Sequence, residues 1–479
     1  MSDVLLLHPA EQGITFGGMP PLGMAWITAF LQSKGISTTL FDLQVTEHSI
    51  ESLLQTHKPH VVGIGGTSHT RFESFAIARR VKAYDPDIQI LYGGSHATFT
   101  AENTLGHIPE IDFVVRGEGE QTTYNVVSKV LKEDLNFSNI PGISYRKNGG
   151  IFRNPEVNRI SNLDILPFPY RDPEAMQRYN LQLDFLNIPA ASVVSSRGCP
   201  VNCSFCSASA MFGTQLTVRS AINVVNEIEI LLKEYNYEGV KFFDSTLTLN
   251  RNHIEAICAE IRKRNLKFPW ECEIRVNGMT RDLLHTMRDA GCYYVDFGVE
   301  STSPSVLKTM HKGITLDHVE NVFRWTKELE IFTKVFFTFG HIGETLADAR
   351  ATVEFMERNA KYISVAATGI GVRIYPGTEV EHYARSSKYL RSDFSWSTTF
   401  IDQNVESLGN DPLVPILLQP QFGWREFRKI EFRLARFWLK NPHAALSVIW
   451  SQIKLGRSHV LFRLVQRFIE IHLLRRTPQ

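Results

Sequence analysis

The sequence predicts an α/β protein in which a doubly wound parallel sheet is followed by a partial (βα)6 barrel and a mainly helical C-terminal region. Short apolar strands alternate with amphipathic helices before about residue 140 and again after about residue 186, which predicts the two α/β parts. Apolar residues at helical spacing from about residue 423 predict the helical end. With 479 residues the chain exceeds a single hydrophobic core. We therefore expect domains at residues 1–140, 186–380 and 381–479, with a linker over 141–185.

The first domain is predicted to contain five strands and four helices. The strands are expected at residues 4–8, 37–42, 60–65, 88–93 and 111–115, and the helices at 23–34, 49–57, 71–84 and 121–133. This alternation predicts a Rossmann-like parallel sheet with helices on both faces. In that architecture ligands bind at the carboxyl ends of the strands.

Glycine clusters follow three of these strands. The candidate binding residues in them are Gly65, Thr67 and Ser68, then Gly93, Gly94 and His96, and finally Gly117, Glu118 and Gly119. Glycine lets a ligand approach the backbone, and free N–H groups at a helix start can bind phosphate or amide oxygens. The dinucleotide fingerprint GxGxxG is missing, and the carboxylates of the third cluster would repel a pyrophosphate.

A CxxxCxxC motif formed by Cys199, Cys203 and Cys206 directly follows a predicted buried strand at 190–196. Three thiolates on one short loop can hold three irons of a 4Fe-4S cluster, which normally takes four cysteine ligands, so one iron would stay open. A structural zinc site is the alternative, but it needs four ligands, and the chain has no second CxxC or HxxxH. The other cysteines, Cys258, Cys272 and Cys292, share no ligand spacing and are expected to be core residues.

The second domain is predicted to be a TIM-type partial barrel of six strands. The strands are expected at residues 190–196, 239–244, 270–276, 293–299, 333–339 and 365–374, with helices at 221–235, 253–265, 281–290, 316–329 and 345–359. Polar residues at the carboxyl ends of barrel strands are functional candidates. Glu273 and Arg275 occupy alternate positions of one strand, so we expect them to face the same side and to form an inward ion pair.

Taken together, the cysteine motif and the strand-end residues up to about residue 380 resemble cobalamin-dependent radical S-adenosylmethionine (SAM) enzymes, most closely the class B methyltransferases. The resemblance implies that Cys199, Cys203 and Cys206 bind the cluster and that SAM chelates its open iron. It also implies a SAM site near Asp244, Glu273, Arg275, Glu300 and Tyr375, since these positions match the family's strand-end motifs. Asp244 and the turn at Tyr375 could instead be purely structural.

Residues 18–130 resemble the cobalamin-binding domain that precedes many radical SAM barrels. The sequence lacks the DxHxxG motif with which some cobalamin proteins ligate cobalt, so the resemblance implies that no protein histidine binds the metal and that the 67–71 loop faces its lower side. His69 and His96 remain candidates for ligation or for ordinary hydrogen bonds. Relatives often read FGxPGET after the fifth barrel strand, whereas this chain reads FGHIGET at 339–345, and we assign His341 no role.

The C-terminal residues 421–479 are strongly basic, with twelve Lys or Arg against three Asp or Glu, while the rest of the chain carries 39 against 47. Their apolar residues recur at helical spacing among the cations. Two interpretations are open: a peripheral helix on an anionic membrane surface, or a helical lid on the barrel with a basic outer face. Nucleic-acid binding is not expected, because no recognisable nucleic-acid module accompanies the charge.

The chain shows neither the basic start of a signal peptide nor an apolar run of roughly 18 residues. Its six cysteines, three of them in a cluster motif, fit a reducing compartment. We therefore expect a cytoplasmic protein, with peripheral contact to the inner membrane surface if the basic tail binds lipid.

The resemblance implies an enzyme that methylates an unactivated carbon through a 5′-deoxyadenosyl radical and methylcobalamin. Two alternatives stay open: cyclisation, ring contraction or oxidation without methyl transfer, and a cobalamin-responsive binding protein without catalysis. The expected partners are a small-molecule substrate, which would be lipid-like if the tail lies on a membrane, and an electron donor such as flavodoxin or ferredoxin. The substrate itself is not written in the sequence.

Overall fold

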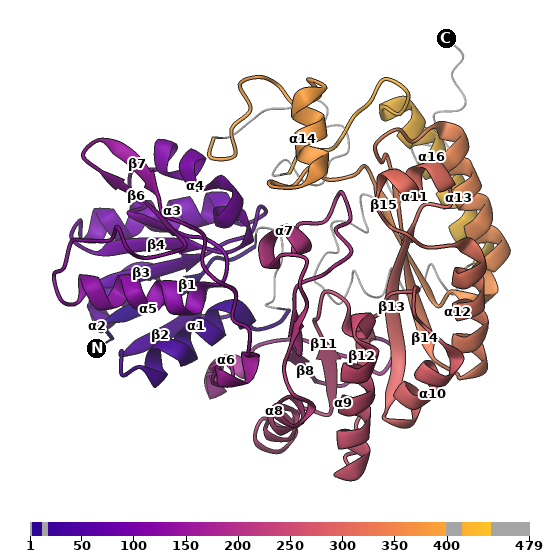
Figure 1. Cartoon of the computed structure of the whole chain (residues 1–479), viewed down its shortest axis with the longest axis horizontal. Coiled ribbons are helices and arrows are strands. Elements are labelled where there is room, and N and C mark those ends of the chain that lie inside the picture. The colour runs from indigo at the N-terminus through magenta and orange to yellow at the C-terminus, as the bar shows by residue number, and fades with distance from the viewer. Residues whose placement is uncertain (1, 12–17, 399–413, 442–479) are drawn as a thin grey trace.

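The computed structural model describes residues 2–11, 18–398 and 414–441. Figure 1 shows a sheet domain and a barrel domain side by side, with the short helix α7 (Ala208–Phe212) between them. The predicted fold class is confirmed: a Rossmann-like parallel sheet, a six-stranded partial barrel and helical C-terminal elements.

The N-terminal sheet has the strand order β2-β1-β3-β4-β5-β6-β7. Its strands are β1 (Val4–His8), β2 (Thr38–Asp42), β3 (Val61–Gly65), β4 (Gln89–Gly93), β5 (Phe113–Val115), β6 (Ile143–Lys147) and β7 (Gly150–Arg153). The first five pair in parallel, whereas β6 and β7 add an antiparallel hairpin at the edge. The sheet thus continues past residue 140, where the sequence predicts a linker.

Helices cover both faces of this sheet. They are α1 (Leu22–Ser33), α2 (Ile50–His57), α3 (Arg71–Tyr84), α4 (Ser95–His107) and α5 (Gly119–Val130). Along β1, Leu5 and Leu7 belong to the core that includes α2, α3 and α4, while Val4 and Leu6 belong to the core that includes α1 and α5. Burial on both faces explains why the strands read as continuous apolar runs.

The barrel consists of six parallel strands in the order β15-β14-β13-β12-β11-β8. The strands are β8 (Ala190–Val193), β11 (Gly239–Phe242), β12 (Trp270–Glu273), β13 (Cys292–Glu300), β14 (Phe332–Phe339) and β15 (Val365–Ile370). The helices around it are α8 (Ala221–Glu234), α9 (Arg251–Lys263), α10 (Arg281–Asp289), α11 (Pro304–Thr309), α12 (Leu316–Glu328) and α13 (Leu346–Asn359). Short elements complete the chain: η1 (Leu163–Ile165), α6 (Pro173–Met176), β9 (Ser196–Arg197), β10 (Thr217–Val218), η2 (Leu247–Leu249), η3 (Ala360–Tyr362), α14 (Glu379–Ser386) and α16 (Trp424–Lys440).

Strand alternation divides the barrel into an apolar outer layer and a polar interior. On β13, Val295 and Phe297 pack into the core under the helices, so Asp296 between them faces inward. Cys258, Cys272 and Cys292 are all buried in the outer layer, which confirms their predicted role as core residues.

The segment that leads into β8 closes the amino end of the barrel. The backbone N–H of Asp184 donates to Glu271 Oε2 at 3.1 Å, and the Tyr293 hydroxyl donates to the Asp184 carbonyl at 2.8 Å. Phe185 stacks on Phe332 with 4.7 Å between the ring centroids. The barrel interior therefore opens toward the carboxyl ends of its strands.

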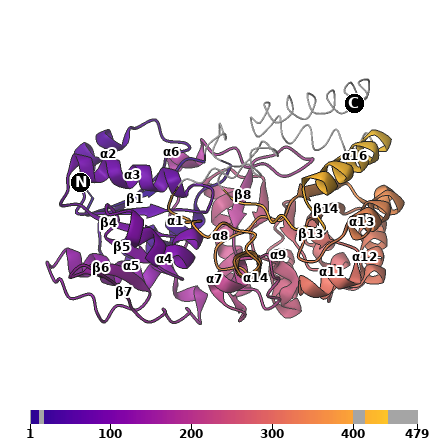
Figure 2. The same ribbon diagram turned by 90° about the horizontal axis from the view of Figure 1, so that it is seen from above.

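Helix α16 lies against α13 on the outside of the barrel (Figure 2). Its apolar side chains pack into the barrel's outer core rather than facing solvent. Phe427, Ile430, Leu434 and Phe437 are buried in the barrel's outer core. Its cations reach carboxylates of α13, as between Arg433 and Glu354 at 3.3 Å. For these residues the packed-helix interpretation holds, and the apolar face is not free for a membrane. Residues 442–479 of the predicted basic tail lie outside the described residues.

Among the helices that the structure describes, none combines the length and the apolar character that crossing a membrane requires.

We predict that Phe427→Ala destabilises the barrel by about 3–5 kcal/mol, because it empties a fully buried aromatic site. Thermal or denaturant unfolding of the full chain measures the effect. The matched control is Leu439→Ala on the same helix, whose side chain is 61% exposed and whose loss should cost less than about 0.5 kcal/mol. Equal effects of the two substitutions would contradict the packing of α16.

Candidate functional site

The three-cysteine loop begins directly after β9 at the carboxyl end of the first barrel strand. Gly198 opens the loop with φ +97°, and a Cβ at this position would collide with the backbone oxygen of Gln215. A glycine is therefore required there. Cys199 and Cys203 are half-buried, Cys206 is exposed, and none of the three forms a disulfide.

Two backbone hydrogen bonds fix the middle of this loop between other strand ends. The Ser204 N–H donates to the Met310 carbonyl at 3.1 Å, and the Val380 N–H donates to the Ser204 carbonyl, also at 3.1 Å. The loop is thus held by the segment after α11 and by the first turn of α14. Both contacts lie far away in the sequence.

The chemistry of the loop fits a metal cluster that assembles with its ligands. Burial raises the pKa of the half-buried Cys203 thiol, while Lys312 opposes the shift, so this free thiol stays protonated at neutral pH. Metal binding would release its proton. Within the described part of the chain, no three His, Cys, Asp or Glu side chains already converge as a metal site.

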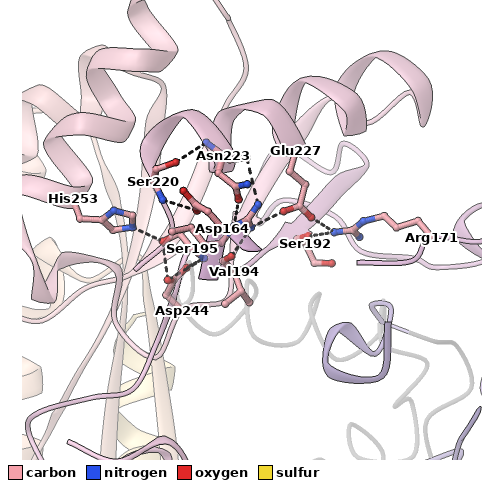
Figure 3. A network of polar contacts seen from close by, with 11 residues as sticks. Asp164, Arg171, Ser192, Val194, Ser195, Ser220, Asn223, Glu227, Asp244 and His253 are labelled. Carbon is pink, nitrogen blue, oxygen red and sulfur yellow. Dashed lines mark hydrogen bonds and ion pairs between the residues drawn. The ribbon is translucent and has the colours of Figure 1, made fainter. Parts of the chain in front are cut away.

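Asp244, at the carboxyl end of β11, supports the entry into the cysteine loop (Figure 3). Its carboxylate accepts hydrogen bonds from the Ser195 N–H at 3.1 Å, from the Ser195 hydroxyl at 2.8 Å and from the Ser196 hydroxyl. Burial raises the pKa of Asp244, and these three donors oppose the shift. Figure 3 shows Asp244 directed at the β8 end, which favours a structural role.

Next to the hydrogen bonds of Asp244, Glu227 of α8 bridges two buried guanidinium groups (Figure 3). Its oxygens lie 2.9 Å from Arg171 and 2.6 Å from Arg219. Arg219 also donates to the Val194 carbonyl at 2.8 Å, so this ion-pair network fixes the end of β8 from the helix side.

Glu300 lies at the end of β13 in a polar chain beside the cysteine loop. Lys312 Nζ is 3.1 Å from Glu300 Oε1, and the Thr338 hydroxyl donates to Glu300 Oε2 at 3.0 Å. His341 Nε2 in turn lies 2.5 Å from Thr338 Oγ1, and its ring packs edge-on against Phe205 at 5.3 Å between centroids. The predicted Glu300 site is therefore linked through Thr338 and His341 to Phe205, one of the two residues between Cys203 and Cys206.

The expected ion pair between Glu273 and Arg275 does not form. Ile274 and Val276 both pack into the outer core, so Arg275 faces the same side as Glu273, but its guanidinium has another partner. The Arg275 guanidinium donates to the Lys312 carbonyl, and its N–H is bonded to Thr248. Glu273 faces the barrel interior without a hydrogen bond or ion pair to another described residue.

A cavity of about 400 Å³ lies between the carboxyl ends of the N-terminal strands and the cysteine side of the barrel. Seven of the predicted binding residues line it: Gly65, Thr67, Gly93, Gly94, Gly117, Glu118 and Gly119. From the barrel side come Arg197, Phe243 and, on α7, Met211 and Phe212. The cavity thus lies between the sheet domain and the residues that flank the cysteine loop, whereas the three cysteines themselves do not line it.

Glycine is sterically necessary just after the carboxyl ends of the neighbouring strands β3 and β4. Gly94 adopts φ +106°, and a Cβ there would meet the Gly66 carbonyl oxygen at 2.5 Å. A Cβ on Gly66 would in turn lie 2.8 Å from the Ser74 hydroxyl and 2.9 Å from Tyr92. The backbone at these two positions therefore carries no side chain, which would let a large planar ligand approach it closely.

The two histidines that the sequence offers as cobalt ligands lie at hydrogen-bond distance from other side chains of the protein. His96 is only 1% exposed and does not line the cavity: its Nδ1 lies 3.0 Å from the hydroxyl of Ser68, and its ring packs on Trp396. Burial and Arg71 hold its pKa well below the ordinary value. His69 Nε2 lies 3.1 Å from the Tyr375 hydroxyl, which links the 67–71 loop to the turn before α14.

Arg197 joins the two domains beside the first cysteine. Its guanidinium lies 2.8 Å from Glu118 and 2.6 Å from Glu120, and all three side chains are at least nine-tenths buried. The same group stacks on Trp26 at 4.9 Å. Arg197, Glu120 and Trp26 all line the cavity, and the sequence analysis missed them as site residues. Two glutamates beside a glycine cluster were visible in the sequence, but their distant partner was not.

A glycine-lined cavity against a parallel barrel whose first strand leads into three cysteines defines the class of the protein. Residues 193–356 match the family described as "Radical SAM superfamily", and residues 15–127 match "B12 binding domain". An uncharacterized methyltransferase of Pyrococcus horikoshii is 32% identical over 398 residues, covering 81% of this chain and 84% of the relative. The chain belongs to the cobalamin-dependent radical SAM enzymes, whose cofactors are SAM, a 4Fe-4S cluster and cobalamin.

Two further comparisons agree with this assignment. The anaerobic magnesium-protoporphyrin IX monomethyl ester cyclase of Rubrivivax gelatinosus is 29% identical over 360 residues, covering 71% of this chain and 63% of the cyclase. The structure of the radical SAM methyltransferase TsrM from Kitasatospora setae, with tryptophan and a SAM analogue bound, superposes with a TM-score of 0.73. That match covers 97% of this chain and 99% of the other at 18% identity, so it supports the fold alone.

We predict that Arg197→Met destabilises the full chain by about 3–5 kcal/mol, because it leaves two buried carboxylates without a counterion. The control is the triple variant Arg197→Met, Glu118→Gln, Glu120→Gln, which removes the buried charges together and should recover most of the loss. Thermal unfolding compares the three proteins. A triple variant no more stable than the single one would contradict a charge-based junction.

We predict that His341 makes stability depend on pH. Burial and Lys312 lower its pKa from 6.5 to about 3, so folding keeps the ring neutral while the unfolded chain binds a proton. This contribution is complete above pH 6.5 and is lost as the pH falls toward 3. Between pH 7.5 and 5.5, His341→Gln should lose about 1 kcal/mol less stability than the unmodified chain. The exposed His285→Gln is the control, and identical pH slopes for all three proteins would refute the prediction.

Proposed function

We propose that this enzyme transfers a methyl group to an unactivated carbon of a small molecule. The observation that carries the proposal is the single cavity shared by the glycine edge of the sheet and the cysteine side of the barrel. When bound, the cluster and SAM would supply a radical that abstracts a hydrogen atom from the substrate carbon, and the corrinoid would supply a transferable methyl group. The methyltransferase relative, of which the chain covers 84%, supports the same reaction class.

Cys199, Cys203 and Cys206 are the proposed cluster ligands. They share one loop, their thiols are free, and Gly198 and Ser204 fix that loop through backbone contacts. The protein's own contribution is to hold three sulfur donors at the barrel mouth and to limit access of water.

For SAM we propose the strand ends beside this loop. Arg275 and Glu300 offer charged groups beside this loop, and Tyr375 lies at the turn before α14. Glu273, which the sequence also predicts as a SAM residue, lies two residues before Arg275 at the end of β12 and is not assigned to SAM. Asp244 would act indirectly, by fixing the entry to the loop. Glu300 also has φ +65°, an uncommon conformation for a glutamate that fits a constrained site.

The glycine edge is the proposed cobalamin site. Gly65, Gly93, Gly94, Gly117 and Gly119 expose backbone to the cavity, together with Thr67 and Glu118. Ser68 and His96 would support this edge from behind, since they bond to each other and do not line the cavity. With His69 bonded to Tyr375 and His96 buried, neither is proposed as a cobalt ligand.

Radical chemistry without methyl transfer is the second candidate, favoured by the similarity to the anaerobic cyclases. Either reaction requires a reductant for the cluster, so we propose an electron donor such as flavodoxin or ferredoxin. A cytoplasmic location is proposed because all six cysteines are free thiols. Helix α16 uses its apolar face against the barrel, so we do not propose that this face binds a membrane.

We predict that the anaerobically reconstituted chain cleaves SAM and that replacing any one motif cysteine by alanine abolishes cleavage and iron loading. Cys258→Ala, in the core and away from the loop, should keep the cluster absorbance and is the control. Mass spectrometry of the product then decides between the candidates. A gain of one methyl group with release of S-adenosylhomocysteine supports methyl transfer, whereas 5′-deoxyadenosine without S-adenosylhomocysteine contradicts it.

A further inference from the structure

We propose that Asp296 and Glu273 form an anionic subsite inside the barrel that binds a cationic group, such as a protonated amine, of the substrate. The identification of the ligand as substrate rests on the proposed function. The negative character of the subsite does not, because it follows from the arrangement of charged side chains.

Strand geometry places three charged residues at one level of the barrel interior. In the sheet register Glu273 on β12 pairs with Asp296 on β13, and Asp296 pairs with Lys334 on β14. The neighbours of Asp296 along β13 pack outward under the helices, so its carboxylate points inward. The same alternation directs Glu273 inward, because Cys272 and Ile274 pack outward.

The carboxylate of Asp296 lacks a hydrogen-bond donor. The residue is 6% exposed, and its Oδ1 atom has no hydrogen-bond partner among the described residues. Its nearest cation is Lys334, whose Nζ lies 3.8 Å from Oδ2, beyond hydrogen-bond distance. A buried carboxylate oxygen without a donor is costly, so it marks a place where a ligand can contribute one.

The remaining cations of the interior already have partners. Lys241 pairs with Glu271, Lys312 lies 3.1 Å from Glu300, and Arg275 donates to the Lys312 carbonyl. Glu273 and Asp296 are therefore left with Lys334, whose ammonium also lies 5.2 Å from the centroid of the Phe336 ring. Two carboxylates and one available ammonium leave a net negative charge at this level.

The electrostatics of Asp296 agree with a missing cation. Burial raises its pKa to about 7, Glu271 and Glu273 add to the rise, and Lys334 and Lys241 only partly oppose it. An ammonium ligand would stabilise the ionised form.

Solvent reaches the subsite at Glu273. Glu273 is exposed although it points into the barrel, so the interior is accessible at this level. The segment around Asp184 and Phe185 closes the opposite end. Phe336 beside Lys334 offers an apolar surface for the body of the ligand. A wholly uncharged lipid would cover both carboxylates without supplying a donor, so the structure favours a substrate with an apolar body and a cationic group.

The test compares 2-phenylethylammonium with the uncharged isostere 2-phenylethanol as probes of the cluster- and cobalamin-loaded full chain. Saturation-transfer NMR at pH 8 measures both dissociation constants, since Asp296 is then largely ionised and an alkylammonium, like lysine with its pKa of about 10.4, stays protonated. The ammonium should bind at least about tenfold more tightly than the alcohol. Asp296→Asn should abolish most of that preference.

Glu273→Gln is the second variant, because its exposed side chain can change without loss of packing, and it should also reduce the preference. Asp317→Asn on the outer surface of α12 is the matched control and should leave the preference unchanged. Equal binding of the two probes, or a preference unaffected by both interior variants, overturns the proposal.

A final arm separates the substrate from SAM, which also carries an ammonium group. Saturating SAM should leave probe binding intact, whereas displacement of the probe by SAM would assign the carboxylates to the SAM site and overturn the substrate assignment. The result is independent of product analysis. Methyl transfer without charge preference would refute only the subsite, and charge preference without methyl transfer would refute only the proposed reaction.

Discussion

The buried contact of Arg197 with Glu118 and Glu120 is the interaction on which the rest of the structure depends. One guanidinium two residues before the first motif cysteine pairs with two carboxylates at the start of α5. It thereby connects the glycine edge of the sheet to the loop that carries the thiols. Arginine suits this role because its planar fork can serve two carboxylates at once while its face stacks on Trp26.

The barrel fixes the other side of the same loop. Asp244 holds its entry, Met310 and Val380 hold Ser204 in its middle, and the ring of His341 packs on Phe205. Each support comes from the carboxyl end of a different strand or from the turn after it. A parallel barrel brings these ends together, so one short loop receives ligands, charges and packing partners from distant parts of the chain.

The sequence predicted local structure better than side-chain partners. Strand β1 and helix α3 have the predicted bounds, because their apolar patterns are unbroken. Helix α4 was missed, since it begins directly after Gly94 and contains Thr100 in a non-helical conformation. The ion pair of Arg275 with Glu273 was predicted wrongly because the guanidinium donates to the Lys312 carbonyl, a distant partner that no local pattern reveals. Arg197 could not be paired with its glutamates, since about 80 residues separate them and no local pattern encodes the contact.

The central claim is that one cavity receives the corrinoid from the sheet and lies beside the cysteine loop of the barrel. Anomalous diffraction from crystals of the loaded enzyme at the iron and cobalt absorption edges tests it most directly. The account predicts iron bonded to the sulfurs of Cys199, Cys203 and Cys206 and cobalt within the cavity lined by Gly65, Gly94 and Gly117. Cobalt bound elsewhere, or iron held by other residues, would contradict it.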